Sequence, residues 1–313
     1  MTQYQISDFE KEVLKGLSAP NKYLLSKYFY DEEGSRIFQE IMRMEEYYLP
    51  SCETEILQEQ SADIIKCLPF DQLDIIELGA GDGSKTVFLL ESFVRSGKIL
   101  NYLPMDISPD ILEVNKKNIH QVLPNLPIRT IAGDYFHTLE QIKSRPYPKI
   151  ILFMGSNIGN FKGENAIEFI KFIHAHLQPD DFFLLGVDLK KHPKTILAAY
   201  NDHQGITKRF NLNLLKRINR ELDSNFDLQA FDHYCCYDPV SGTASSYLVS
   251  LKRQKTLVCQ REFDFRKDEV IHMEISQKYS LEDLDQMGQK TGFSWDRHFL
   301  DKKDYFSVSL FKK

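Results

Sequence analysis

The stretch that decides the fold runs Ile75-Ile76-Glu77-Leu78-Gly79-Ala80-Gly81-Asp82-Gly83-Ser84-Lys85-Thr86. A short apolar run ends in a glycine-rich turn, and a segment with helical spacing follows. Glycine lets the backbone bend and approach a ligand closely. A dinucleotide fingerprint G-x-G-x-x-G begins in the same way, but residues 84–86 contain no glycine to complete it. The turn therefore predicts a ligand site on a strand-turn-helix unit and leaves the ligand open.

Short apolar runs recur through the middle of the chain and alternate with amphipathic segments. We expect strands at 75–78, 102–105, 128–132, 150–154 and 182–187. Strands that alternate with helices are typical of a parallel, doubly wound α/β sheet, which binds its ligands at the carboxyl ends of the strands. The expected fold is therefore Rossmann-like.

The flanking regions follow other patterns. Residues 7–67 have helical spacing, with expected breaks at Pro20, Gly34 and Pro50. Residues 190–278 predict helices at 195–200 and 211–222, then strands from 233 to 276, as an inserted α+β lobe. Ser280 followed by acidic residues marks a helix start, and the alternation at 306, 308 and 310 predicts a closing strand.

Two acids at strand ends indicate which ligand the glycine turn binds. Asp106 follows the second strand and could accept hydrogen bonds from both ribose hydroxyls, as in NAD enzymes. Gly133-Asp134-Tyr135 follows the third strand and offers a carboxylate to an adenine amino group and a ring to stack on the base. These strand-end residues together favour S-adenosylmethionine (SAM) over NAD. The rival interpretation is that both acids are solvated loop residues.

The fourth strand ends in a loop from Gly155 to Asn160, with the sequence Gly-Ser-Asn-Ile-Gly-Asn. Its glycines and amides would border the place of a transferable methyl group, because they lie at a strand carboxyl end. The same residues would also make an ordinary turn.

Composition narrows the partners. The formal net charge of −6 and a pI near 5.9 disfavour a nucleic-acid surface, since phosphate binding needs a basic stripe. Five scattered cysteines fit a reducing cytoplasm, and no apolar run is long enough for a signal peptide or a membrane span. His174 and His176 do not share a helix face, so we expect solvated residues and no metal site. We expect a cytoplasmic monomer that acts on a small molecule.

Several short motifs in the sequence do not occur together in generic methyltransferases. They are Tyr30-Asp31-x-x-Gly34-Ser35, Glu46-Tyr47-Tyr48, the Gly155–Asn160 loop, Ala199-Tyr200-Asn201-Asp202, Phe210-Asn211, Asn219-Arg220-Glu221-Leu222 and Glu274-Ile275-Ser276-x-Lys278-Tyr279. Across residues 28–310 the chain resembles the L-histidine N-alpha-methyltransferases of ergothioneine biosynthesis, which are related to a fungal dimethylallyltryptophan N-methyltransferase. The resemblance implies a SAM-binding domain at 54–188 and 279–313, and a substrate lobe at 1–53 and 189–278.

The resemblance also implies roles for individual residues. Asn160 and Tyr200 would grip the substrate carboxylate, and Tyr30 would lie near the amine; these three are the expected catalytic residues. The implied substrate-binding set is Tyr30, Tyr47, Gly155, Asn160, Tyr200, Ser246, Glu274 and Ser276, in which Tyr47, Glu274 and Ser276 would hold the imidazole. The implied cofactor set, for SAM and its product S-adenosylhomocysteine (SAH), is Gly79, Gly81, Lys85, Asp106, Asp134 and Tyr135.

One position departs from the family pattern. Ser246 aligns with a methionine that usually lines the imidazole pocket, so the pocket could be wider or wetter. The expected activity is N-alpha-methylation of free histidine, up to the trimethylated betaine. Alternatives are an N-methyltransferase of another, perhaps aromatic, amino acid or amine, and a catalytically silent SAM-binding module. An NAD oxidoreductase is disfavoured by the missing third glycine.

Overall fold

The computed structural model describes residues 7–142, 145–161 and 163–313. The chain divides into two compact units. Unit 1 comprises the residues up to Tyr48 and Lys191–Ser276, and unit 2 comprises Leu49–Lys190 and Gln277–Lys313. The first boundary lies before helix α3 (Leu49–Lys66), a continuous helix whose start at Leu49 brings residue 53 into unit 2. The functions assigned to the two units stay predictions.

A seven-stranded sheet forms the centre of unit 2, in the order β11-β12-β5-β4-β1-β2-β3. The parallel strands are β1 (Leu73–Leu78), β2 (Ile99–Asp106), β3 (Ile131–Ala132), β4 (Lys149–Phe153) and β5 (Phe182–Asp188). The antiparallel strands are β11 (Trp295–Leu300) and β12 (Phe306–Lys312). The predicted Rossmann-like α/β class is confirmed, and all carboxyl ends of the parallel strands share one edge.

Two strand predictions need correction. The third strand was expected at 128–132 but covers only Ile131–Ala132, because Ile128 makes a single isolated bridge to Tyr102. Strand β11 was not predicted, since its sequence WDRHFL neither alternates nor forms an apolar run.

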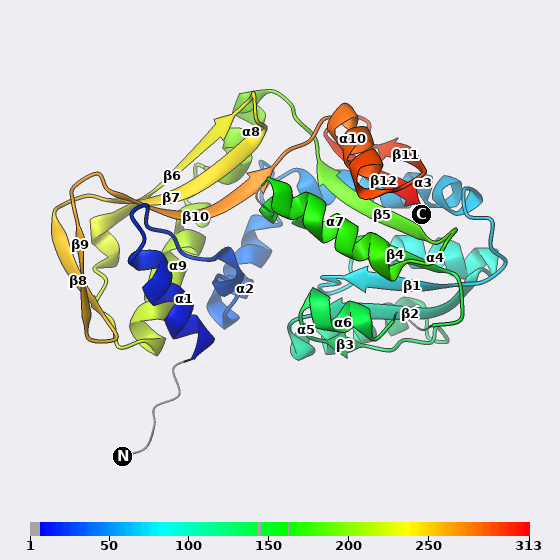
Figure 1. Cartoon of the computed structure of the whole chain (residues 1–313), viewed down its shortest axis with the longest axis horizontal. Helices are drawn as coiled ribbons and strands as arrows, with labels where there is room; N and C mark the ends of the chain where they lie inside the picture. The colour runs from blue at the N-terminus through cyan, green and yellow to red at the C-terminus, as the bar shows by residue number, and fades with distance from the viewer. Residues whose placement is uncertain (1–6, 143–144, 162) are drawn as a thin grey trace, which may run out of the picture. The chain divides into compact units, whose positions relative to one another are not determined.

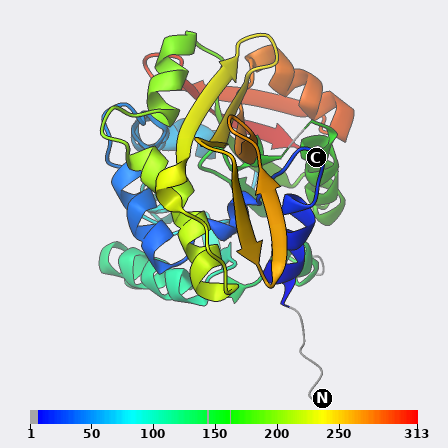
Figure 2. The same cartoon turned by 90° about the vertical axis from the view of Figure 1, so that its left-hand side faces the viewer.

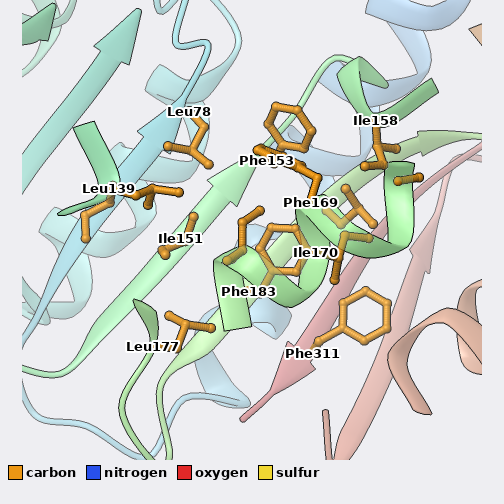
Figure 3. Close-up of a cluster of buried hydrophobic side chains, with 14 of the residues drawn as sticks. Leu78, Leu139, Ile151, Phe153, Ile158, Phe169, Ile170, Leu177, Phe183 and Phe311 are labelled. Atoms are coloured by element: carbon orange, nitrogen blue, oxygen red, sulfur yellow. The ribbon is translucent and has the colours of Figure 1, made fainter. Parts of the chain in front are cut away.

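Helices cover both faces of this sheet (Figure 1). Besides α3 they are α4 (Thr86–Ser96), α5 (Pro109–Val122), α6 (Tyr135–Glu140), α7 (Glu164–His176) and α10 (Leu281–Thr291), with the 3-10 helix η2 (Asn157–Asn160). Figure 3 shows Phe169 and Ile170 of α7 beside Ile151 and Phe153 of β4 and Phe183 of β5. This apolar layer holds the loop after β4 against the sheet.

Unit 1 has a sheet in the order β10-β7-β6 and a separate β8–β9 hairpin, seen in yellow and orange in Figure 2. The strands are β6 (Phe231–Asp238), β7 (Thr243–Ser250), β8 (Gln254–Val258), β9 (Arg261–Phe265) and β10 (Val270–Gln277). The helices are α1 (Asp8–Leu17), η1 (Ser26–Tyr28), α2 (Glu32–Ile41), α8 (Pro193–Tyr200), α9 (Ile206–Glu221) and η3 (Leu228–Ala230). One apolar core joins α1, α2 and α9 to the strands.

Local chemistry explains where some helices begin. Ser280 caps α10 and forms a capping box with Asp283, as predicted. Gly34 was expected to break a helix but lies in the first turn of α2, where a Cβ would come within 1.7 Å of the Phe29 carbonyl oxygen. Pro50 was also expected to be a break. It lies in the first turn of α3, where the missing N–H costs nothing.

Another expectation fails at His176, which is buried at the end of α7 rather than solvated. Its Nδ1 lies 2.8 Å from the Phe172 carbonyl oxygen and its Nε2 lies 3.0 Å from Glu140 Oε1.

Among the described residues, no helix is long and apolar enough to cross a membrane.

Candidate functional site

The glycine turn after β1 is shaped by its backbone. Gly79, Gly81 and Gly83 have φ values of 68°, 54° and 73°, in the left-handed region that favours glycine. The N–H groups of Gly79 and Ala80 donate to the Met105 carbonyl oxygen at 2.8 and 3.0 Å, which ties the turn to the end of β2. A Cβ at Gly81 would meet no described atom within 4 Å. The turn therefore leaves open space beside it.

Asp106 faces this turn from the end of β2. Its Oδ2 accepts from Gly81 N–H at 3.2 Å and its Oδ1 accepts from Ser108 N–H at 3.1 Å. A carboxylate has about four acceptor positions, so both oxygens can accept further bonds. The turn and the half-buried carboxylate thus lie side by side, and the predicted contacts of Gly79, Gly81 and Asp106 with the cofactor stay predictions.

The third strand end carries Asp134 and Tyr135. Asp134 caps α6, because its Oδ1 accepts from the N–H groups of Phe136 and His137 at 2.9 and 3.2 Å. A bond from the His137 ring and these backbone bonds hold the pKa of Asp134 below its usual value. The Tyr135 ring packs edge-on against Phe153, with its hydroxyl beside Gly79. Both residues thus lie at the predicted edge, and their adenine contacts stay predictions.

The loop after β4 is fixed from two sides. Gly155 has φ 72° and donates its N–H to Glu53 Oε1 of α3 at 2.6 Å. Ser156 is in the left-handed conformation, and its Oγ accepts from Asp188 N–H of β5 at 3.0 Å. Asn160 ends η2 and is exposed. Asn160 is thus exposed at the end of a loop that these bonds anchor, and its ligand contact stays a prediction.

Sequence reasoning missed two buried acids behind these loops. Glu53 bonds Gly155 and forms an ion pair with Lys85. Glu77 of β1 accepts from Thr86 Oγ1 at 2.6 Å and from the Tyr102 hydroxyl, and burial raises its pKa to about 7. For Glu77 the available signal was an acid within an otherwise apolar strand, since such a group is buried only when it has partners. Glu53 lies in a mixed helical segment, which gives no such signal.

In unit 1 the structure brings three predicted residues together. The hydroxyl groups of Tyr200 and Ser276 are 2.9 Å apart and both side chains are buried. The Tyr47 ring meets the Tyr200 ring edge-on, with centroids 6.0 Å apart. This cluster joins α8, β10 and the segment after α2, which are far apart in the sequence.

Three other predicted residues of unit 1 lie as follows. Ser246 is buried on β7, opposite Cys235 of β6. Glu274 is half-buried on β10, where the buried positions are Ile271, Met273 and Ser276, so that the alternation shifts by one residue beside Glu274. Tyr30 is exposed and packs against two phenylalanine rings, those of Phe38 and Phe210.

Several residues of the motifs that carry the family resemblance also stabilise the ends of helices. Asp31 caps α2 and also accepts from Asn213 and Arg220. Asp202 accepts from the N–H groups of Ile206 and Thr207 at 2.8 Å each, and so starts α9 five residues before the expected position 211. These motifs therefore specify helix starts, and their ligand roles stay predictions.

The described ranges hold no group of three or more histidine, cysteine, aspartate or glutamate residues that could bind a metal. What they do hold is a sheet with a glycine turn, strand-end acids and a rigid fourth loop. This arrangement is typical of the class of SAM-dependent methyltransferases.

The chain belongs to the family of histidine-specific, SAM-dependent methyltransferases, whose model matches residues 9–313. It is therefore a SAM-dependent amino-acid N-methyltransferase, and the predicted family and cofactor are confirmed.

Relatives with long alignments include two that are named histidine N-alpha-methyltransferase. That of Mycobacterium tuberculosis (strain CDC 1551 / Oshkosh) is 31% identical, over 97% of this chain and 94% of the relative. That of Mycolicibacterium smegmatis (strain ATCC 700084 / mc(2)155) is 33% identical, over 96% and 93%. The L-tryptophan methyltransferase trpM of Psilocybe serbica is 26% identical, over 95% and 91%.

Proposed function

We propose that this enzyme methylates the alpha-amine of free L-histidine, with up to three transfers to give the trimethylated betaine. The observation that carries the proposal is the buried Tyr200–Ser276 pair beside Tyr47, with Glu274 two residues before Ser276. Hydroxyl groups suit a carboxylate or a ring nitrogen, and the Glu274 carboxylate suits an imidazole N–H. A site built to bond such an N–H discriminates strongly against side chains that lack it.

The reaction asks mainly for orientation from the protein. When bound, SAM supplies a methyl group on a positively charged sulfur, which takes back the bonding electrons as the amine nitrogen attacks. Asn160 and Tyr200 would hold the substrate carboxylate, and Glu274 the ring, so that the neutral amine is the nucleophile presented to the methyl group.

The amine must first lose a proton. Water, or Tyr30 in its phenolate form, would accept that proton; the Tyr30 side chain is exposed. Each transfer leaves the nitrogen more substituted, and the third gives a permanent cation. Tyrosine rings such as Tyr47 and Tyr200 stabilise cations through their faces.

A second candidate is methylation of another aromatic amino acid. Ser246 supports it, because a small polar side chain is buried where the family pattern has methionine. The similarity to an L-tryptophan methyltransferase also supports it. Both candidates share one cofactor site, so substrate competition separates them.

We further propose that the enzyme acts as a cytoplasmic monomer.

Mass spectrometry of a reaction with SAM and an equimolar mixture of the twenty amino acids tests the proposal. We expect mass gains of one, two and three methyl groups on histidine alone. Gains on tryptophan or tyrosine instead would replace histidine with the second candidate. No gain on any amino acid would contradict both candidates.

The variant Ser246→Met serves as the matched comparison. It restores the side chain of the family pattern, and it should lower any methylation of larger rings while histidine turnover is kept. If Ser246→Met abolishes histidine turnover, the alignment of this position with the imidazole pocket is wrong.

A further inference from the structure

Glu53 is a buried acid near the start of α3 that the mechanism above does not use. Its side chain is 1% exposed, and its helical neighbours Cys52, Ile56 and Leu57 belong to the apolar core. A carboxylate in such a place is stable only when charged or polar groups surround it. Its partners therefore show why the fold keeps it there.

Three segments of the sheet edge meet at this one carboxylate. Its Oε1 accepts from Gly155 N–H, at 2.6 Å, and its Oε2 forms the ion pair with Lys85 Nζ. Gly186 of β5 leaves room for it, since a Cβ there would lie 2.5 Å from Oε1. Glu53 thus links the end of the glycine turn, the loop after β4 and β5.

The two charged partners differ in exposure. Glu53 is shielded, whereas the Lys85 side chain is 23% exposed. The Lys85 ammonium lies 3.8 Å from the place of a Cβ on Gly155, so it stands beside the loop after β4. An ammonium has three donor protons, and Glu53 takes one. The others are available to an anion that reaches the carboxyl edge of the sheet.

The chemistry of the cofactor matches this arrangement. SAM and SAH carry a free amino-acid end with a carboxylate, and an adenosine end with ribose hydroxyl groups. Asp106 has the acceptor oxygens suited to the ribose, and Lys85 lies on the same glycine turn. The carboxylate of the amino-acid end would form a charge-assisted hydrogen bond with Lys85.

We propose that Glu53 is a positioning residue, which fixes the Lys85 ammonium at the Gly155 loop so that it binds the carboxylate of the methionine end of SAM. The inference rests on SAM dependence and not on histidine as the acceptor. Its failure and that of the proposed function are therefore separate outcomes.

A pair of ligands tests this role by isothermal titration calorimetry. SAH has the amino-acid end, and 5′-methylthioadenosine has the same adenosine and sulfur without it. In Glu53→Gln we expect the SAH affinity to fall by about 10- to 100-fold, the usual range for one charge-assisted bond. The affinity for methylthioadenosine should stay within about twofold of its original value.

A purely structural role for Glu53 predicts a different pattern, in which both ligands lose affinity equally. That pattern, or an unchanged SAH affinity, would overturn the proposal. Glu59→Gln is the matched control, because Glu59 lies on the same helix but is half-exposed and pairs with Lys302. It should change neither affinity.

A second variant covers the case in which Glu53→Gln fails to fold. The double variant Glu53→Gln/Lys85→Met removes both charges, so no buried charge is left unpaired. It should bind SAH no more tightly than methylthioadenosine. A preference for SAH that survives in this variant would also overturn the proposal.

Discussion

The groups assigned to the cofactor in unit 2 lie at or just after the ends of strands β1, β2 and β3, whereas those assigned to the amino acid in unit 1 come from helix α8, strands β7 and β10 and loops near α2. In unit 2 the backbone shapes the candidate site, through positive φ angles and N–H groups at strand ends. In unit 1 side-chain contacts make it, such as the Tyr200–Ser276 bond. Binding of the cofactor in unit 2 should therefore depend on few side chains, and binding of the amino acid in unit 1 on many.

The sharpest test of this contrast is Asp106→Ala in unit 2. The change removes the acceptor for the ribose hydroxyls and the bonds to Gly81 and Ser108. We expect the SAH affinity to fall by at least about 100-fold, since each bond to a charged group is worth about 1.5–3 kcal/mol. Calorimetry measures the loss, with Asp110→Ala as the control, because Asp110 is an exposed residue of α5. A normal isotherm for Asp106→Ala would refute the ribose role.

Glu274→Ala applies the same test to unit 1. We expect kcat/KM for histidine to fall by roughly 30- to 100-fold, because the imidazole N–H would lose its charged acceptor. The SAH affinity should stay within about twofold, since the change is in the other unit. Initial rates and calorimetry measure the two effects, and Glu262→Ala on the β8–β9 hairpin is the control. Equal losses in turnover and SAH binding would break the division between the units.

The same contrast explains what could be predicted from the sequence. Strand β1, its glycine turn and Asp106 are contiguous signals, and the structure has them in the predicted order. Local patterns also predicted the start of α10 at Ser280. The closeness of Tyr47, Tyr200 and Ser276 has no local signal, because it depends on how distant segments fold together. It was reached through resemblance alone.

Three residues were misjudged or passed over in the sequence for two different reasons, one local and one distant. Gly34 and Pro50 were expected to break helices, yet both lie in the first turn of one. At Gly34 only glycine fits beside the Phe29 carbonyl group, and at Pro50 the first turn does not need the missing N–H. Glu53 was not singled out in the sequence, because its partners Lys85 and Gly155 are far along the chain. Its burial could be known only from the fold.

Glu77, in strand β1 of unit 2, predicts how the stability of the protein depends on pH. Its pKa is about 7 in the folded chain and has a reference value of 4.5, so between these pH values the folded state keeps a proton that the unfolded state has lost. Stability from this group is therefore lost as the pH rises through that window. Glu77→Gln should flatten the loss, and gain roughly 2–3 kcal/mol relative to the original chain between pH 5 and pH 8.

Urea unfolding at several pH values measures this difference. Gln keeps partners for Thr86 and Tyr102, so the variant should fold. A constant difference in the free energy of unfolding at all pH values would mean that Glu77 does not titrate in this range. The Glu59→Gln variant, at a half-exposed position of α3, should show no such trend.

The smallest expected effect is that of Tyr200→Phe, which tests the side-chain cluster of unit 1. The change removes a buried bond of 2.9 Å to Ser276 but keeps the ring that meets Tyr47. We expect the free energy of unfolding to fall by about 1 kcal/mol. The KM for histidine should also rise by about tenfold, if Tyr200 holds the substrate carboxylate.

A double-mutant cycle with Ser276→Ala separates the two effects of the Tyr200 hydroxyl. For stability the two changes should be less than additive by about 1 kcal/mol, because each removes the same bond. For KM, Tyr200→Phe should retain its effect in the Ser276→Ala background, since the substrate carboxylate would be a separate partner. If the KM effect disappears together with the bond, Tyr200 only supports Ser276, and the carboxylate contact must come from another residue.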